Sequence, residues 1–448
     1  MSHLVAISSG MLSPKKGDQP FYRAHRYLNY GLLSLASRIP SIVQVLHGNF
    51  TPPNLFLNKN PSILEANVIL LSIPSFYGVP WASELVKEII ARKKSIEIHI
   101  GGRWVIDQNW NFIKLQFPSS VYIHRGIGEK VIDSLVNRWR KNGTLSHNQN
   151  RSATPLNYAL LSELETFHPS VEVSRGCGLG CAFCEEANEP LSRLIRPANL
   201  LTQISEISES YIGKKNFYFE SSMFAPSIEW ANQLLNLYLA RDETFLWRTE
   251  TRADVISREK LAILAQAGLK VLDIGLESAS PEQLLNMKKT SKPEAYIRKA
   301  SEMLHACKDL GIKAKVNILL YPGETYSTLQ ETRQFLSDHS DAIFGVSTYP
   351  VVAYGTGDRI KYFDNLYRSQ GSTGIHKTNI EGVWDVGLSP ELGAIESKLE
   401  ARNIAREFMS KENYYYLKKF SYLDPAYSWE TFSNDVRHIK HEDRPFGY

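Results

Sequence analysis

The chain has 448 residues, of which 43% are hydrophobic and 22% are charged, and its formal net charge is only +4. This composition excludes disordered and fibrous proteins, and the length indicates two to three domains. No apolar run approaches the roughly 18 residues that a membrane span requires, and no secretory leader is recognisable. We therefore expect a soluble, cytoplasmic protein without a membrane partner.

The first 145 residues alternate strand-like apolar runs with amphipathic stretches. Strands are expected at 4–8, 42–46, 68–73, 96–100 and 121–124, with helices at 26–37, 81–93 and 128–138. This alternation predicts an α/β fold that begins with a doubly wound, Rossmann-like parallel sheet. Ligands of such sheets bind beyond the carboxyl ends of the strands, here the loops around Ser72, Gly101 and Gly126. The region is modestly basic but lacks a basic helix or interleaved aromatic residues, so nucleic acid is not an expected partner.

A polar stretch rich in Asn and Ser predicts a linker at 146–165, and a second alternating region follows it. Its strands are expected at 171–173, 217–220, 245–250, 271–276, 314–320 and 343–349, with helices between them. Six successive strand-helix units predict a partial (β/α)6 TIM-like barrel over 166–354, with chemistry at the carboxyl ends of its strands. The aromatic-rich remainder, 355–448, does not continue the strand-helix alternation and is interpreted as a C-terminal cap of helices and loops.

Three of the four cysteines, Cys177, Cys181 and Cys184, lie within eight residues, directly after an apolar strand. This clustering argues against a disulfide framework and for a metal site in a reducing compartment. Three thiolates on one loop can ligate three irons of a cubane cluster and leave the fourth iron open to another molecule. The glycines between them have no β-carbon, so the backbone can curl closely around a cluster.

A structural zinc ion is the alternative for these cysteines. Zinc would need a fourth ligand, and no histidine follows within the usual spacing. Cys307 belongs to a helical apolar stripe with Met303 and Leu304, so we interpret it as a core residue rather than a metal ligand.

The C-x-x-x-C-x-x-C spacing and its position after the first strand resemble the radical S-adenosylmethionine (SAM) superfamily. The resemblance implies a [4Fe-4S] cluster whose open iron binds SAM, and reductive cleavage of SAM to a 5′-deoxyadenosyl radical. It also implies SAM contacts from residues in matching segments: Phe183 at the adenine, Glu220 at the amino group, Arg252 at the carboxylate, Glu277 and Ser278 at the ribose, and Glu324 after the fifth barrel strand. Glu277 and Glu324 also fit plainer roles, as a strand-end salt bridge and a helix N-terminal carboxylate.

The N-terminal sequence resembles the cobalamin-binding domain that precedes the barrel in one radical SAM subgroup. In this resemblance Ser72, Gly101 and Gly102 are the expected contacts to the corrin tail, because small residues let a bulky cofactor approach the strand ends. The chain lacks the Asp-x-His-x-x-Gly motif that can supply an axial imidazole, and His47 is interpreted as an ordinary loop residue. The alternative is a degenerate domain that is retained for packing or substrate binding.

The resemblance implies an enzyme that methylates an unactivated carbon of a small-molecule or natural-product substrate, with cobalamin as methyl carrier. A reducing partner such as flavodoxin or ferredoxin is expected. Cyclisation, rearrangement or another carbon-skeleton change on the same architecture is the close alternative. An iron-sulfur redox sensor is the alternative from a different class.

Overall fold

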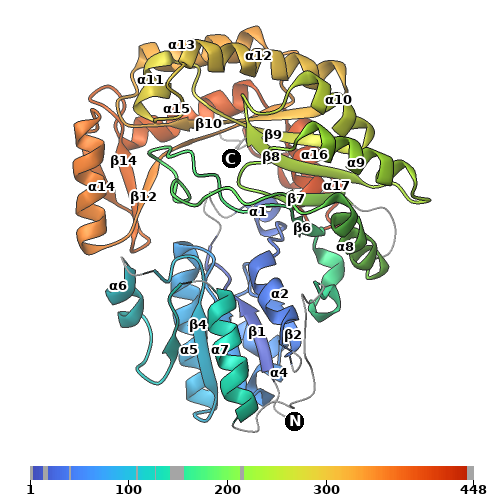
Figure 1. Cartoon of the computed structure of the whole chain (residues 1–448). Coiled ribbons are helices and arrows are strands. Elements are labelled where there is room, and N and C mark those ends of the chain that lie inside the picture. The colour runs from blue at the N-terminus through green and yellow to red at the C-terminus, as the bar shows by residue number, and fades with distance from the viewer. Residues whose placement is uncertain are drawn as a thin grey trace.

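The computed structural model describes residues 4–13, 19–39, 42–106, 109–126, 128–141, 156–211 and 216–440. Figure 1 shows an N-terminal region built on one parallel sheet, below a larger region built on a second parallel sheet. The two regions confirm the predicted order of a doubly wound sheet followed by a partial barrel. No helix within the described ranges is long and apolar enough to cross a bilayer.

The N-terminal sheet has the strand order β2-β1-β3-β4-β5. Its parallel strands are β1 (Leu4–Ser8), β2 (Ile42–His47), β3 (Val68–Ser72), β4 (Glu97–Gly101) and β5 (Tyr122–Ile123). Alternate residues of β1 enter two separate cores, which is typical of a parallel strand covered by helices on both faces. Since β2 and β3 lie on opposite sides of β1, the carboxyl ends of β1 and β3 form the topological switch point, where such sheets bind ligands.

Seven helices connect these strands in the described part of the region. They are α1 (Pro20–Arg23), α2 (Tyr30–Ser37), α3 (Pro53–Lys59), α4 (Ser62–Glu65), α5 (Val79–Arg92), α6 (Trp110–Leu115) and α7 (Gly128–Lys141). The first predicted helix was placed from residue 26, whereas α2 begins at Tyr30. The reason is the Asn29 side chain, which accepts the backbone N–H of Leu32 at 3.0 Å and caps the helix there.

The larger sheet contains six parallel strands in chain order, which confirms the predicted partial barrel. They are β6 (Ser170–Glu172), β7 (Asn216–Glu220), β8 (Leu246–Arg252), β9 (Leu269–Glu277), β10 (Lys313–Leu320) and β11 (Gly345–Pro350). Helices cover its outer face in Figure 1: α8 (Pro197–Glu209), α9 (Ile228–Leu239), α10 (Arg258–Gln266), α11 (Pro281–Asn286), α12 (Pro293–Asp309) and α13 (Tyr326–Asp338). In β10 the buried residues alternate with partly exposed ones, so one side faces these helices and the other faces the barrel interior.

The barrel interior is polar near the amino ends of the strands. The guanidinium of Arg248 donates to both carboxylate oxygens of Asp273, at 2.5 and 2.8 Å, and Lys315 Nζ lies 3.0 Å from the same carboxylate. Arg248 also donates to the carbonyl of Leu417 on α16 (Lys411–Ser421), at 2.7 Å. Helix α16 therefore packs on the inner face of the sheet at this end.

The C-terminal region contains a three-stranded antiparallel sheet that the sequence did not predict. Its strands are β12 (Val352–Tyr354), β13 (Gly374–Lys377) and β14 (Val383–Gly387), and its helices besides α16 are α14 (Gly357–Ser369), α15 (Ala394–Glu407) and α17 (Trp429–Asp435). Strands of three to five residues are too short to show a clear alternation. Helix α15 packs against β11, the edge strand of the barrel, as expected of a cap.

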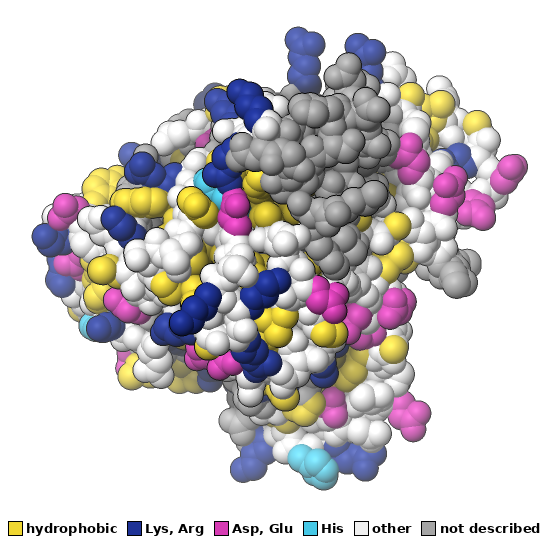
Figure 2. Space-filling model, turned by 90° about the horizontal axis from the view of Figure 1, so that it is seen from below, with side chains coloured by type: hydrophobic (Ala, Val, Ile, Leu, Met, Phe, Trp, Pro, Cys, Tyr) yellow, Lys and Arg dark blue, Asp and Glu magenta, His cyan; other side chains and the backbone are white. Residues whose placement is uncertain are grey.

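Residues 146–155 of the expected linker lie outside the described residues. The rest of it packs against the N-terminal sheet: Tyr158 is buried, and Leu161 forms a parallel bridge with Val45 on β2. Figure 2, which views the molecule from below, shows Lys and Arg side chains spread among hydrophobic and acidic ones rather than gathered in one stripe.

Candidate functional site

The three clustered cysteines lie on an irregular loop between β6 and α8, and all three thiols are free. Cys181 is buried, Cys177 is half-buried and Cys184 is exposed. The loop needs glycine at position 176, where φ is +72° and a β-carbon would lie 2.4 Å from the carbonyl oxygen of Pro190. The sequence thus bends the chain so that the cysteines line one short turn.

Each thiol has its own neighbours. Cys177 Sγ lies 3.8 Å from Met223 Sδ, Cys184 Sγ accepts the backbone N–H of Glu186 at 3.3 Å, and Cys181 Sγ accepts from Arg252 at 3.9 Å. Burial raises the pKa of the Cys181 thiol, although the nearby Lys289 and Arg252 charges favour its thiolate. Among the described side chains, no three from His, Cys, Asp and Glu are arranged to hold a single metal ion.

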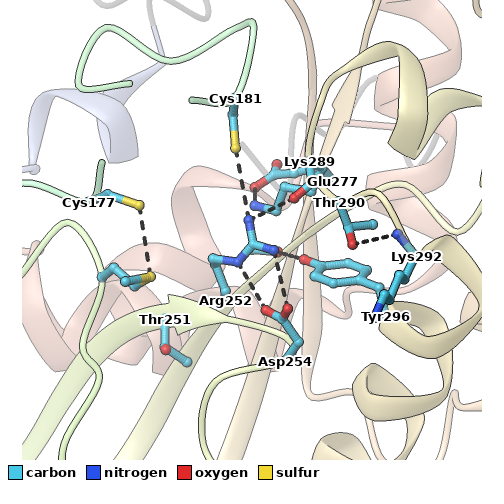
Figure 3. A network of polar contacts seen from close by, with 12 residues as sticks. Cys177, Cys181, Thr251, Arg252, Asp254, Glu277, Lys289, Thr290, Lys292 and Tyr296 are labelled. Atoms are coloured by element: carbon cyan, nitrogen blue, oxygen red, sulfur yellow. Dashed lines mark hydrogen bonds and ion pairs between the residues drawn. The ribbon is translucent and has the colours of Figure 1, made fainter. Parts of the chain in front are cut away.

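Arg252 stands beside the buried thiol at the end of β8 (Figure 3). Its Nε donates to Asp254 Oδ1 at 2.9 Å, its Nη2 donates to Asp254 Oδ2 at 3.3 Å, and its Nη1 donates to the carbonyl of Lys289 at 2.9 Å. The guanidinium also packs over the ring of Tyr296, 5.3 Å from the centroid. The side chain expected to bind a SAM carboxylate is therefore fixed in place by the protein's own groups.

A second buried cation lies next to Arg252. Lys289 Nζ pairs with Glu277 Oε1 at 2.9 Å and lies 5.7 Å from the centre of the Phe183 ring. Burial alone would lower the pKa of Lys289, but the Glu277 carboxylate outweighs burial and raises it, so the ammonium is charged. Glu277 itself has φ of +68°, a left-handed conformation that a non-glycine residue adopts only when its surroundings hold it there.

Three further residues expected at SAM have other partners. Glu220 accepts from Ser170 Oγ at 2.8 Å, and burial raises its pKa to about 7. Ser278 Oγ lies 3.1 Å from Thr332 Oγ1, and Glu324 accepts from Thr328 Oγ1 at 2.6 Å; both pairs join the barrel to α13. Burial raises the pKa of Glu324 to about 7 as well. The structure brings Phe183, Arg252 and Glu277 into one network around Cys181, and their contacts to SAM stay predictions.

At the N-terminal sheet, two of the three expected contact residues, Ser72 and Gly102, have structural partners too. Ser72 Oγ accepts from the amide of Asn29 at 3.1 Å. Gly102 has φ of +127°, and a β-carbon there would lie 2.3 Å from the Ile73 carbonyl oxygen, whereas a β-carbon on Gly101 would meet nothing closer than 4.0 Å. Gly102 is therefore required by close backbone packing, and Gly101 borders open space.

A cavity of about 540 Å³ lies at the switch point of this sheet, between the N-terminal region and the barrel. Its lining includes Ser9, Gly10, His47, Ser75, Glu220 and Lys418. The hydroxyl of Ser9 is buried without a hydrogen-bond partner, and so is Nδ1 of His47. A ligand or an ordered water in the cavity would satisfy these two polar atoms.

Ion pairs tie the cysteine loop to both neighbouring regions. Arg359 on α14 donates to both oxygens of Glu185, at 2.7 and 2.6 Å, one residue after Cys184. Glu186 pairs with Arg103 from the N-terminal region at 2.9 Å. The loop is thus held between the N-terminal sheet and the C-terminal region.

Residues 171–336 match the radical SAM superfamily. They form a radical SAM domain. Two solved structures share the wider architecture: the cobalamin-dependent SAM radical enzyme OxsB, with aqua-cobalamin and SAM bound, and the radical SAM methyltransferase TsrM from Kitasatospora setae, with tryptophan and a SAM analogue bound. No curated protein sequence matches the chain.

The structural similarity to OxsB and TsrM shows the fold of the regions that precede and follow the radical SAM domain. OxsB is 17% identical with a TM-score of 0.60, over 83% of this chain and 55% of its own, so the chain spans about half of OxsB. TsrM is 15% identical with a TM-score of 0.62, over 93% of this chain and 90% of its own.

Several residues around the cysteines of the radical SAM domain were not found from the sequence. Lys289 and Met223 carry no motif, and only the fold brings them beside the thiols. Asp254 had a weak signal, since it lies two residues after Arg252. The pair of Glu185 and Arg359 could not be predicted, because the two are 174 residues apart.

Proposed function

We propose that this chain is a cobalamin-dependent radical SAM enzyme that methylates an unactivated carbon of a small-molecule substrate. The supporting observation is the combination, in one chain, of a three-cysteine loop and a ligand cavity at the switch point of a sheet that faces the barrel. Either feature alone would support a less specific function.

The cysteine loop fits a cubane cluster in its donor set. Cys177, Cys181 and Cys184 would each bind one iron, and Cys307 is buried in the core, away from the loop. When bound, the cluster and SAM would supply radical hydrogen abstraction, and cobalamin would supply a transferable methyl group. A flavodoxin or ferredoxin would deliver the electrons in this proposal.

The switch-point cavity fits part of a corrinoid. Its volume is below that of a whole cobalamin. Its lining is mostly apolar, and its few polar groups, including the orphaned Ser9 hydroxyl, suit the hydroxyl and amide groups of the tail. Gly101 leaves open space at the end of β4, as the expected contact requires.

His47 does not serve as the axial ligand in this proposal. Its Nε2 accepts the backbone N–H of Asn29 at 3.0 Å, and burial lowers its pKa to about 3, so the imidazole is neutral. A neutral ring whose Nε2 accepts carries its proton on Nδ1. His47 therefore offers the cavity a donor and no lone pair for cobalt.

The experiment is to express the protein with cobalamin supplied and to incubate it with SAM, a reductant and substrate. Methylation consumes two SAM and two electrons, and yields methylated product, 5′-deoxyadenosine, methionine and S-adenosylhomocysteine. Corrinoid should co-purify at near one per chain, and His47→Ala should leave the spectrum of the bound corrinoid unchanged. With deuterated-methyl SAM the label should enter the product.

Two outcomes would favour the alternatives. Product and 5′-deoxyadenosine without S-adenosylhomocysteine or label would show a cyclisation, rearrangement or other carbon-skeleton change. A reduced protein that cleaves no SAM under any condition would point to an iron-sulfur redox sensor.

A further inference from the structure

Arg252 has a feature that the expected role in SAM binding does not explain. It is 9% exposed, and one edge of its guanidinium faces Asp254 while Nη1 faces Cys181 Sγ at 3.9 Å (Figure 3). The carbonyl of Lys289 accepts from the same Nη1 at 2.9 Å. With Nε and Nη2 bound to Asp254, the positive group cannot turn away from the thiol without breaking these bonds.

The charges around Arg252 are arranged asymmetrically. Asp254 neutralises the side of the guanidinium that is remote from Cys181, and Lys289 has its own partner in Glu277. In a buried site the effective dielectric is low, so a charged donor interacts with a nearby sulfur more strongly than it would in water. Lys289 acts on the Cys181 thiol through its charge, whereas Arg252 Nη1 also donates a hydrogen bond to the sulfur.

We propose that Arg252 is a positioning residue that donates to the Cys181 thiolate and raises the reduction potential of the cluster. The inference rests on the proposed function, since it requires a cluster on these cysteines. A cluster that takes up one electron gains negative charge, part of which lies on its thiolates. Hydrogen bonds to cluster sulfurs stabilise the reduced form and raise the potential.

The test is a redox titration of the anaerobically reconstituted cluster without SAM, followed by electron paramagnetic resonance. Arg252→Gln should lower the ratio of reduced to oxidised cluster about tenfold at a fixed potential, a shift of about 59 mV for one electron. Arg252→Lys keeps the positive charge but lacks the planar guanidinium with its fixed N–H donors. A smaller decrease of the reduction potential is therefore expected. The control is Arg258→Gln, because Arg258 is 63% exposed and pairs with Asp309 away from the cysteines.

The absence of SAM separates this role from that of a SAM-carboxylate partner. If Arg252→Gln keeps the wild-type potential and only weakens SAM binding, the inference is overturned. If Arg252→Gln retains no cluster, Arg252→Lys decides: a lowered potential supports the inference and a wild-type potential overturns it. A wild-type protein that binds no cluster would instead refute the proposed function.

Discussion

The buried ion pair of Arg248 and Asp273 holds the polar end of the barrel interior together, and Asp273→Asn tests its contribution. Both residues are 2% exposed, and Asp273 also accepts from Lys315. Removing one charge of such a pair leaves the other uncompensated, which destabilises by about 3–5 kcal/mol. An unfolding entropy of about 2.1 cal/mol/K per residue gives roughly 0.9 kcal/mol/K for this chain, so Tm should fall by about 3–5 °C.

Differential scanning calorimetry of the reduced apo-protein at pH 7 measures this effect. The matched control is Asp309→Asn, since Asp309 pairs with Arg258 at 2.7 Å but both side chains are more than half exposed. An exposed pair contributes about 0–1 kcal/mol, so its Tm should change by about 1 °C or less. Equal shifts in the two variants would refute the reasoning that burial makes the Asp273 pair important.

The same variant has a defined pH dependence. Burial alone would raise the pKa of Asp273, but the Arg248 and Lys315 charges hold it well below its ordinary value of about 3.9. A depressed pKa in the folded state gives stability that is present above the unfolded pKa and is lost as the pH falls. The difference in unfolding free energy between wild type and Asp273→Asn should therefore become smaller below about pH 4.

Two further predictions concern the surroundings of the site. Glu324 has a pKa raised by burial to about 7, so the folded state binds more protons than the unfolded state between about pH 4.3 and 7, and wild-type stability falls as the pH rises. Denaturation measured from pH 5 to 8 should show the unfolding free energy of Glu324→Gln rising by about 2 kcal/mol relative to that of wild type. An unfolding free-energy difference that stays constant over this range would contradict the raised pKa of Glu324. Arg359→Gln removes the two bonds to Glu185 beside Cys184, so the reconstituted protein should lose iron to a chelator several-fold faster than the exposed control Arg368→Gln. Equal rates would show that the pair does not hold the loop.

The repeating units of the fold could be predicted from the sequence, because long parallel strands read as apolar runs. All eleven expected strands correspond to strands β1 to β11, with ends shifted by up to a few residues. The short strands β12 to β14 and the short helices α1, α3, α4, α6 and α11 were missed, because so few residues show no period.

The site could be predicted only where neighbouring residues carry the chemistry. Cys177, Cys181 and Cys184 lie on one loop, so their spacing alone predicted a cluster site. The side chains that surround these thiols come from separate strands and loops, and their contacts are set by packing. Arg252 illustrates the limit: its position was predicted, but the neighbours that fix its orientation were not.

The iron content of the cysteine variants tests the central claim most directly. Anaerobically reconstituted wild-type protein should hold one four-iron cluster with an electron paramagnetic resonance signal after reduction. Cys177→Ala, Cys181→Ala and Cys184→Ala should each abolish it, while Cys307→Ala, which changes a thiol buried in the core, should retain it. Normal cluster content in any one of the first three variants would contradict the assignment of the site.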